Sequence, residues 1–161
     1  MTRRALVYRG PAADEDCPEA AAMLVATSSW NFEVEFVGPK ERIRLSDVDL
    51  RTVDLYVQPG GGHSVRRAYR KVKRHRSSIR DYVDGGGRYL GICMGGYLAA
   101  HWRGFGLTPT DADQYITSDH ANVTTDRDTI VEVVWRGTRR YMFFQDGPLF
   151  ETHPVSPGDV L

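Results

Sequence analysis

Cys93 stands in a residue pattern that can activate a thiol as a nucleophile. Gly91 lies two residues before it and Gly95 two residues after it. This Gly-x-Cys-x-Gly sequence is typical of a strained turn between a strand and a helix, where glycines let neighbouring backbone pass close by. A thiol at the start of a helix also lies at the positive end of the helix dipole, which favours the thiolate. The alternative is a small buried side chain, since cysteine is among the most buried residue types.

The elements on either side of Cys93 are predicted from local patterns. Residues 88–92 follow a run of three glycines and predict a short buried strand. Residues 94–102 are mostly small and apolar and predict a helix that begins directly after the cysteine. The turn between this strand and this helix would lift the Cys93 side chain clear of the sheet.

A second glycine-rich turn follows an earlier strand. Residues 53–57 predict a strand that runs directly into the Pro-Gly-Gly-Gly turn of residues 59–62. In α/β folds, the loops that leave the carboxyl ends of strands carry the binding groups. Ser64 has the side chain of a helix N-cap, so we expect a helix to begin at residue 65.

The remaining patterns give the order of the elements. Before the second glycine turn we expect a strand at 5–8, a helix at 19–27, a strand at 32–36 near a sheet edge and a short helical connection at 46–50. After residue 102 we expect short strands at 114–118 and 122–125 and an antiparallel hairpin of 129–135 with 139–145. The alternation before residue 102 predicts an α/β fold, a mostly parallel sheet covered by helices on both faces.

The predicted helical segment 65–84 is strongly basic. A break at Ser77-Ser78 would divide it into two helices. Its cations are Arg66, Arg67, Arg70, Lys71, Lys73, Arg74, Arg76 and Arg80. A solvated helix face explains them better than an anionic partner surface, because no aromatic interleaving or nucleic-acid-binding motif accompanies them. We therefore expect no nucleic-acid partner.

Composition limits the classes of protein to which this sequence can belong. The 161 residues suffice for one domain with a real core, and 41% hydrophobic with 26% charged residues is ordinary for a globular protein. The net charge of +0 gives no overall field that would attract nucleic acid or a membrane. Cys17 and Cys93 do not make a disulfide framework, and no apolar stretch is long enough for a membrane span. We expect a cytoplasmic thiol protein with no membrane partner.

The two glycine motifs together resemble the class I glutamine amidotransferase-like superfamily. They are Val57-Gln58-Pro59-Gly60-Gly61-Gly62 and Gly86-Gly87-Arg88-Tyr89-Leu90-Gly91-Ile92-Cys93-Met94-Gly95-Gly96-Tyr97. The second is similar to the Gly-Gly-x-Tyr-Leu-Gly-x-Cys-x-Gly-x-Tyr pattern of the branch named for the N-terminal domain of some eukaryotic biotin–protein ligases. The hairpin and residues 145–150 resemble a later segment of that branch. The resemblance covers most of residues 5–160 and implies a single flavodoxin-like, three-layer α/β/α domain spanning 1–161. The biotin ligase catalytic core is absent, so no biotin transfer is expected.

The resemblance also implies roles for specific residues. Cys93 would be the nucleophile, and the backbone N–H groups of Met94 and of the Gly60-Gly61 turn would form the oxyanion hole. Two donors from separate loops suit an acyl-transfer intermediate, whose negative charge develops on one oxygen. The implied substrate is a small amide, and we expect neither a cofactor nor a metal ion.

The histidine and carboxylate of the family, usually His-Pro-Glu after the last core strand, have no counterpart in this sequence. His153-Pro154 is followed by Val155, and the family's further strand pair would come after a segment like residues 158–161. We therefore expect a domain without the family's final strands and His-Pro-Glu segment, either naturally short or truncated. An exposed sheet edge would then favour a homodimer.

Other histidines are candidates to pair with Cys93. His63 follows the glycine turn, and His120 lies beside an aspartate in a predicted loop. His153 is a third candidate. His75 is expected to be solvated in the basic segment, and His101 to be a packing residue beyond the helix that follows Cys93.

Three functions remain open from the sequence. The first is a cysteine hydrolase or amidotransferase-like enzyme that cleaves a small amide. The second is a non-catalytic relative that keeps the turn at Cys93 as architecture and binds a ligand or a protein. The third, an α/β-hydrolase, fits less well, because that fold needs more chain and the Pro-Gly-Gly-Gly turn suits the amidotransferase-like fold better.

Overall fold

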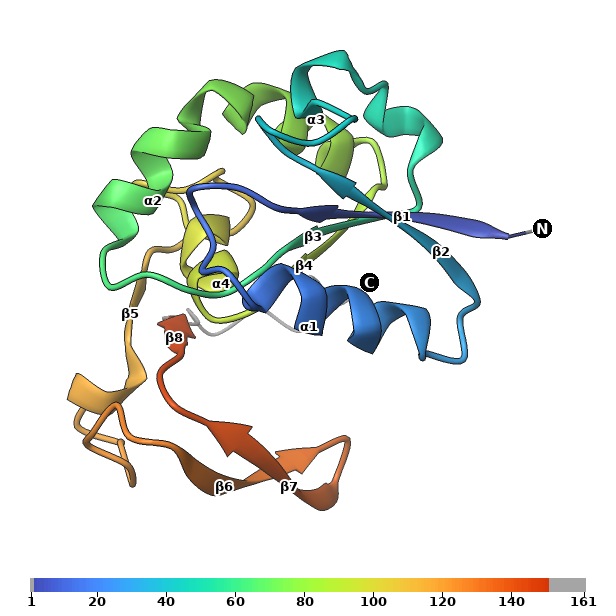
Figure 1. The fold of residues 1–161 in the computed structure, drawn as a ribbon. Helices are drawn as coiled ribbons and strands as arrows, with labels where there is room; N and C mark the ends of the chain where they lie inside the picture. Colours follow the sequence, from blue (N-terminus) through green and yellow to red (C-terminus); the bar gives the residue numbers. More distant parts are fainter. Residues whose placement is uncertain (1, 151–161) are drawn as a thin grey trace, which may run out of the picture.

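The central element is a four-stranded parallel sheet (Figure 1). The structure is a computed structural model, which describes residues 2–150. The strands are β1 (Arg3–Tyr8), β2 (Phe32–Val37), β3 (Leu55–Gln58) and β4 (Arg88–Gly91), in the spatial order β2-β1-β3-β4. In the strand register, Val7 of β1 pairs with Phe36 of β2 on one side and with Val57 of β3 on the other. The predicted parallel sheet is confirmed, and so is the edge position of β2.

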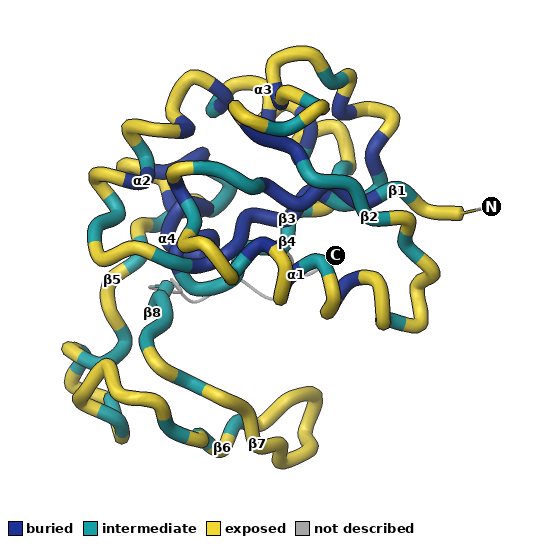
Figure 2. The backbone as a smooth tube through the Cα atoms, in the orientation of Figure 1, coloured by how far each residue is buried: buried dark blue, intermediate teal, exposed yellow. Residues whose placement is uncertain are grey.

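Helices cover both faces of this sheet and make three layers. The helices are α1 (Cys17–Ala26), α2 (Val65–Val72), α3 (Arg76–Asp84) and α4 (Met94–Ala99). Ala5 and Val7 of β1 pack with Val25 of α1, whereas Leu6 and Tyr8 pack on the opposite side, with side chains of α2, α3 and α4. Because consecutive strand residues point to opposite faces, β1 is buried on both sides, as its apolar run predicts (Figure 2). The predicted three-layer α/β fold is thus confirmed.

The basic segment is divided earlier than the sequence predicts. The 3₁₀ turn Lys73–His75 separates α2 from α3, so the predicted break at Ser77-Ser78 is wrong. This tighter turn places Val72, His75 and Ile79 all on the buried side of the segment. Ser64 caps α2 as predicted, its hydroxyl accepting a hydrogen bond from the backbone N–H of Arg67.

The helix after Cys93 is shorter than predicted, because it ends at Ala99 and not at Trp102. The following chain turns back and satisfies the carbonyls at the end of α4. The N–H of Phe105 donates to Leu98 O at 2.6 Å, and the N–H of Leu107 donates to Ala99 O at 2.8 Å. Gly106, with φ of 74°, supplies the left-handed conformation that this reversal requires.

The C-terminal part forms two small antiparallel sheets beside the main body (Figure 1). Strands β6 (Thr129–Trp135) and β7 (Thr138–Phe144) form the predicted hairpin. Strand β5 (Ala112–Gln114) pairs with β8 (Pro148–Phe150), a strand that the sequence did not predict. Among the described residues, no helix combines the length and the apolar character needed to cross a bilayer.

Two of the short strands predicted in this part are wrong. Residues 114–118 contain the 3₁₀ turn Tyr115–Thr117, and 122–125 are irregular. Ser118 Oγ donates to Tyr115 O, and Thr117 Oγ1 donates to Gln114 O. Such local side-chain bonds to the backbone compete with a sheet ladder, which is why the pattern of side chains alone misleads here.

Candidate functional site

Cys93 occupies the turn between β4 and α4, as its sequence pattern predicts. It is the N-cap of α4 and has φ of 50° and ψ of −111°. A positive φ is strained for a residue with a side chain, and such strain is retained only where the surrounding structure enforces it. The preceding residue still extends the sheet, because the Ile92 N–H donates to Gln58 O at 3.1 Å. Cys93 therefore leaves the sheet abruptly, with its side chain half-buried.

The two glycines that flank Cys93 allow α4 to pack closely against the ends of β3 and β4. A Cβ atom at Gly95 would lie 1.9 Å from Gln58 O, and one at Gly91 would lie 2.5 Å from Gly95 O. No side chain fits in either position. The Gly-x-Cys-x-Gly spacing thus has a physical cause in the backbone contacts between α4, β3 and β4.

The loop after β3 forms a wall next to the Cys93 thiol. A Cβ atom at Gly60 would lie 3.1 Å from Cys93 Cβ and 3.8 Å from its Sγ. The backbone N–H of Asp14 donates to Gly60 O at 3.2 Å, so the loop after β1 meets the same wall. The loops that follow β1, β3 and β4 therefore converge where the sheet order changes direction, the position where open α/β sheets bind ligands.

Three backbone N–H groups in these loops are without a partner within residues 2–150. Among the described residues, the N–H groups of Gly60, Gly61 and Met94 donate no hydrogen bond to protein. The N–H of Met94 belongs to the first turn of α4, where intrahelical acceptors are missing. The carbonyl of Cys93 accepts from the N–H groups of Gly96 and Tyr97, which fixes the orientation of that first turn.

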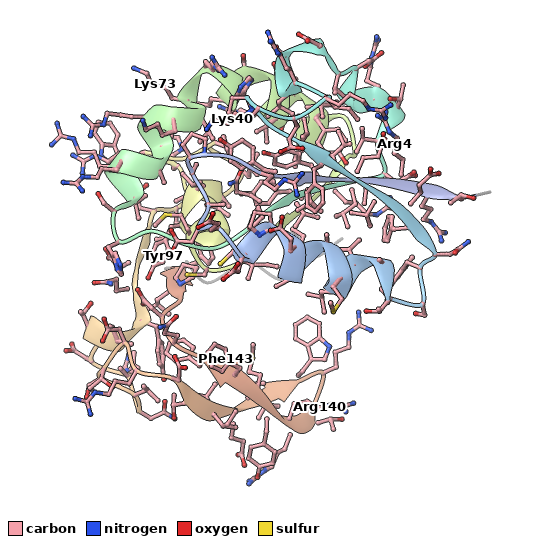
Figure 3. All side chains as sticks on the ribbon, in the orientation of Figure 1. Arg4, Lys40, Lys73, Tyr97, Arg140 and Phe143 are labelled. Carbon is pink, nitrogen blue, oxygen red and sulfur yellow. The ribbon has the colours of Figure 1, made fainter. Side chains whose placement is uncertain are left out.

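A phenol and a carboxylate near Cys93 were missed by the sequence reasoning. The Tyr97 hydroxyl lies 2.9 Å from Gly147 O and 3.2 Å from Asp146 Oδ1, at the end of α4 that faces β8 (Figure 3). The Gln114 side-chain amide donates to Asp146 Oδ2 at 3.0 Å. Burial, followed by the negative charge of Asp146, raises the pKa of Tyr97. The only signal in the sequence was an aspartate directly before a Gly-Pro turn.

Cys17 is the second thiol at this end of the sheet. It begins α1 and is half-buried, and both cysteines are free. Burial is the main cause that raises the pKa of Cys17, and the negative charges of Asp14 and Cys93 add to it. Its N–H donates to Asp14 O, so the loop that contacts Gly60 also positions Cys17.

The candidate histidines are placed on exposed loops. His63 follows Gly62 and precedes α2, and His120 lies after the 3₁₀ turn at residues 115–117. Among residues 2–150, no hydrogen bond joins Cys93 to a histidine. The third candidate, His153, lies outside the described residues, as do Pro154, Val155 and the segment 158–161.

Two other histidines differ from their predicted environments. His75 is only 7% exposed, so its predicted solvation is wrong. The 3₁₀ turn before α3 rotates it toward the sheet, an effect that helical spacing does not reveal. His101 is exposed and not packed as predicted, because α4 ends before it. Within residues 2–150, no three His, Cys, Asp or Glu side chains gather in a way that could hold a metal ion.

Comparison with known proteins now places the chain in a family. The family described as "Biotin-protein ligase, N terminal" matches residues 3–140, which include the whole parallel sheet and the turn at Cys93. No protein of curated function matches this chain. The family match extends over far more than half of the 161 residues. The chain therefore belongs to the biotin-protein ligase N-terminal family.

Proposed function

We propose that this domain is a glutamine amidotransferase-like cysteine hydrolase that cleaves a small amide at Cys93. The single observation that supports it most is the backbone of Cys93, whose φ of 50° and ψ of −111° place a thiol at a strained strand-to-helix turn. Strain of this kind is concentrated at functional sites. The absence of a side chain at Gly60 also supports the proposal, because a Cβ atom there would lie 3.8 Å from Cys93 Sγ.

The proposed reaction has two steps that share one oxyanion site. Cys93 Sγ bonds to the amide carbon, the carbon–nitrogen bond breaks, and the thiol proton leaves with the amine. Water then attacks the thioester, which releases the acid and restores the thiol. In both steps the oxyanion would accept hydrogen bonds from the N–H groups of Met94 and of Gly60 or Gly61, which have no protein partner among the described residues.

The proton carrier remains open between two histidines in this proposal. His63 lies two residues after Gly61 on the same exposed loop, and its ring would have to reach the thiol in the complex with substrate. His120 would need the segment after β5 to fold over the site. We favour His63, because it is attached to the wall that already contacts Cys93.

A binding domain without catalysis is the second candidate. It is favoured by one observation, that no histidine within residues 2–150 is hydrogen-bonded to Cys93. In that case the turn and its free backbone donors would hold a carboxylate or carbonyl group of a ligand or protein.

Ammonia release from a panel of small primary amides, glutamine included, tests the proposal. The wild-type protein and Cys17→Ala should release ammonia, whereas Cys93→Ala should not. His63→Gln should reduce the rate by about 100-fold, the usual value of a general base, and His120→Gln should leave it unchanged. Equal activity of wild type and Cys93→Ala, or none in any protein, would favour the binding domain.

A further inference from the structure

The basic segment and the loop after β2 line a cavity that the proposed reaction at Cys93 does not use. Its volume is about 360 Å³, within the usual range of small-molecule sites. Its lining includes Tyr8, Arg44, Ser46, Lys71, Arg74 and His75. No acidic residue is among them. The cavity lies past the ends of β1 and β2, and Cys93 is not part of its lining.

The wall that carries Arg44 is held in place by the backbone. The N–H of Gly38 donates to Ile43 O at 3.0 Å, and Val37 forms a parallel bridge with Ile43. A Cβ atom at Gly38 would lie 1.8 Å from Arg9 O, so only glycine allows this loop to pack against the end of β1. The loop thereby directs Arg44 toward the cations of α2 and of the 3₁₀ turn that follows it.

The cations of this cavity lack counter-charges. Among the described residues, Arg44, Lys71 and Arg74 take part in no ion pair. Some arginines elsewhere are paired, for example Arg9, which lies 2.7 Å from Glu41 and 2.7 Å from Glu19. Three like charges around one cavity repel each other, and a bound anion would relieve that repulsion.

His75 fixes one of these cations. Arg74 Nε donates to His75 Nε2 at 3.0 Å, which requires that nitrogen to be unprotonated. Burial and the neighbouring Arg74 charge both lower the pKa of His75. A neutral His75 therefore orients the Arg74 guanidinium and leaves its remaining donors to a ligand.

We propose that this cavity binds a small phosphorylated molecule through Arg44, Lys71 and Arg74. Two guanidinium groups and an ammonium group suit the oxygens of a phosphate, because guanidinium can contact two oxygens at once. The Tyr8 hydroxyl lines the same cavity and offers a further donor, whereas the Ser46 hydroxyl donates to Asp47 Oδ1 at 2.7 Å. Its volume exceeds what one phosphate group fills, so the expected ligand is a diphosphate or a phosphomonoester.

Calorimetric titration of the full chain with inorganic pyrophosphate tests this proposal. Arg44→Gln and Lys71→Gln should each weaken binding by about tenfold, since each removes a charge-assisted contact. Lys73→Gln is the matched control, because Lys73 is exposed in the same segment, projects outward and does not line the cavity (Figure 3). Lys73→Gln and Cys93→Ala should bind like the wild type. Arg44 and Lys71 are themselves exposed, so these variants should keep their fold, which circular dichroism would verify.

Further titrations distinguish a phosphomonoester from a diphosphate as the ligand, and both from other anions such as citrate or DNA. Glycerol 3-phosphate binding more tightly than free phosphate would support a phosphomonoester, and pyrophosphate binding more tightly than both would support a diphosphate. No binding of any of these probes at about 10 mM would overturn the proposal. So would citrate binding as tightly as pyrophosphate. Equal loss of pyrophosphate binding in Lys73→Gln, or tighter binding of a DNA oligonucleotide, would also overturn it and indicate a diffuse basic surface.

Discussion

Gly60 and Cys93 are in contact across two loops, such that a Cβ atom at Gly60 would lie 3.1 Å from Cys93 Cβ. These residues are far apart in sequence, yet they join the loop after β3 to the turn after β4. The contact explains why the glycine-rich turn at residues 59–62 and the turn at Cys93 occur together. It also predicts how the reactivity of the thiol depends on the loop.

Substitution of Gly60 by alanine should slow the alkylation of Cys93 by iodoacetamide by several-fold, because the new methyl group crowds the sulfur. Peptide mass spectrometry after timed alkylation measures this rate. Gly62→Ala is the control, since a Cβ atom there meets nothing within 4 Å, although its φ of 82° strains the loop, which Gly60→Ala does not, because Gly60 has no positive φ. If Gly62→Ala slowed Cys93 as much as Gly60→Ala, loop strain and not contact would be the cause.

Cys17 should be alkylated slowly near neutral pH and faster as the pH rises. Burial and the charge of Asp14 raise the pKa of Cys17, so a smaller fraction of it is thiolate at a given pH. Asp14→Asn should therefore increase the alkylation rate of Cys17. Asp16→Asn should have a smaller effect, because the charge of Asp16 contributes less to the shift. A larger effect of Asp16→Asn would show that the position of the α1 N-terminus is different.

His75 should make the protein less stable in mild acid. Its folded-state pKa is lowered, so the unfolded chain binds a proton at a higher pH than the folded chain does. The free energy of unfolding is then undiminished above a pH of about 6.5 and falls as the pH drops through the folded-state pKa. Burial and the positive charge of the neighbouring Arg74 both lower this pKa.

Urea unfolding of wild type and His75→Gln across this pH range measures the effect. Glutamine stays neutral and can still accept a hydrogen bond from Arg74, so the variant should lose less stability than the wild type on acidification. Identical pH dependence in both proteins would show that His75 does not titrate differently on folding.

Tyr97 should stabilise the attachment of β8 to α4. Tyr97→Phe removes the hydroxyl that lies 2.9 Å from Gly147 O, and should lower the free energy of unfolding by about 1 kcal/mol. Hydrogen exchange of residues 146–150 should become faster in this variant. Tyr141→Phe is the matched control. Tyr141 is 73% exposed on the hairpin and its hydroxyl donates to Glu132, so loss of this hydroxyl should have almost no effect on the free energy of unfolding. Equal effects of both variants would contradict the assigned role of Tyr97.

Local patterns predict the parts of the fold that depend on local causes. The apolar run of β1, the alternation in β2 and the hairpin at residues 129–144 follow from side-chain periodicity, and the structure has all of them. The turn at Cys93 was also predictable. Its two glycines are required by backbone contacts, of Gly91 with Gly95 and of Gly95 with Gln58 in the neighbouring strand β3.

Features that depend on distant contacts could not be predicted. Strand β8 exists because residues 148–150 pair with residues 112–114 and pack on α4. The cavity with Arg44 and Arg74 combines three segments, and no one of them reveals it. The burial of His75 depends on a 3₁₀ turn whose position is not evident from spacing.

The most direct test of the central claim, that Cys93 is a nucleophile, is peptide mass spectrometry after brief exposure of the protein to p-nitrophenyl acetate. An attacking thiol would form an acetyl thioester and release p-nitrophenol. We predict the thioester on Cys93 in the wild-type and Cys17→Ala proteins, its loss on treatment with hydroxylamine, and no thioester in Cys93→Ala. Acetylation of Cys17 or of lysines with Cys93 unmodified would contradict the claim.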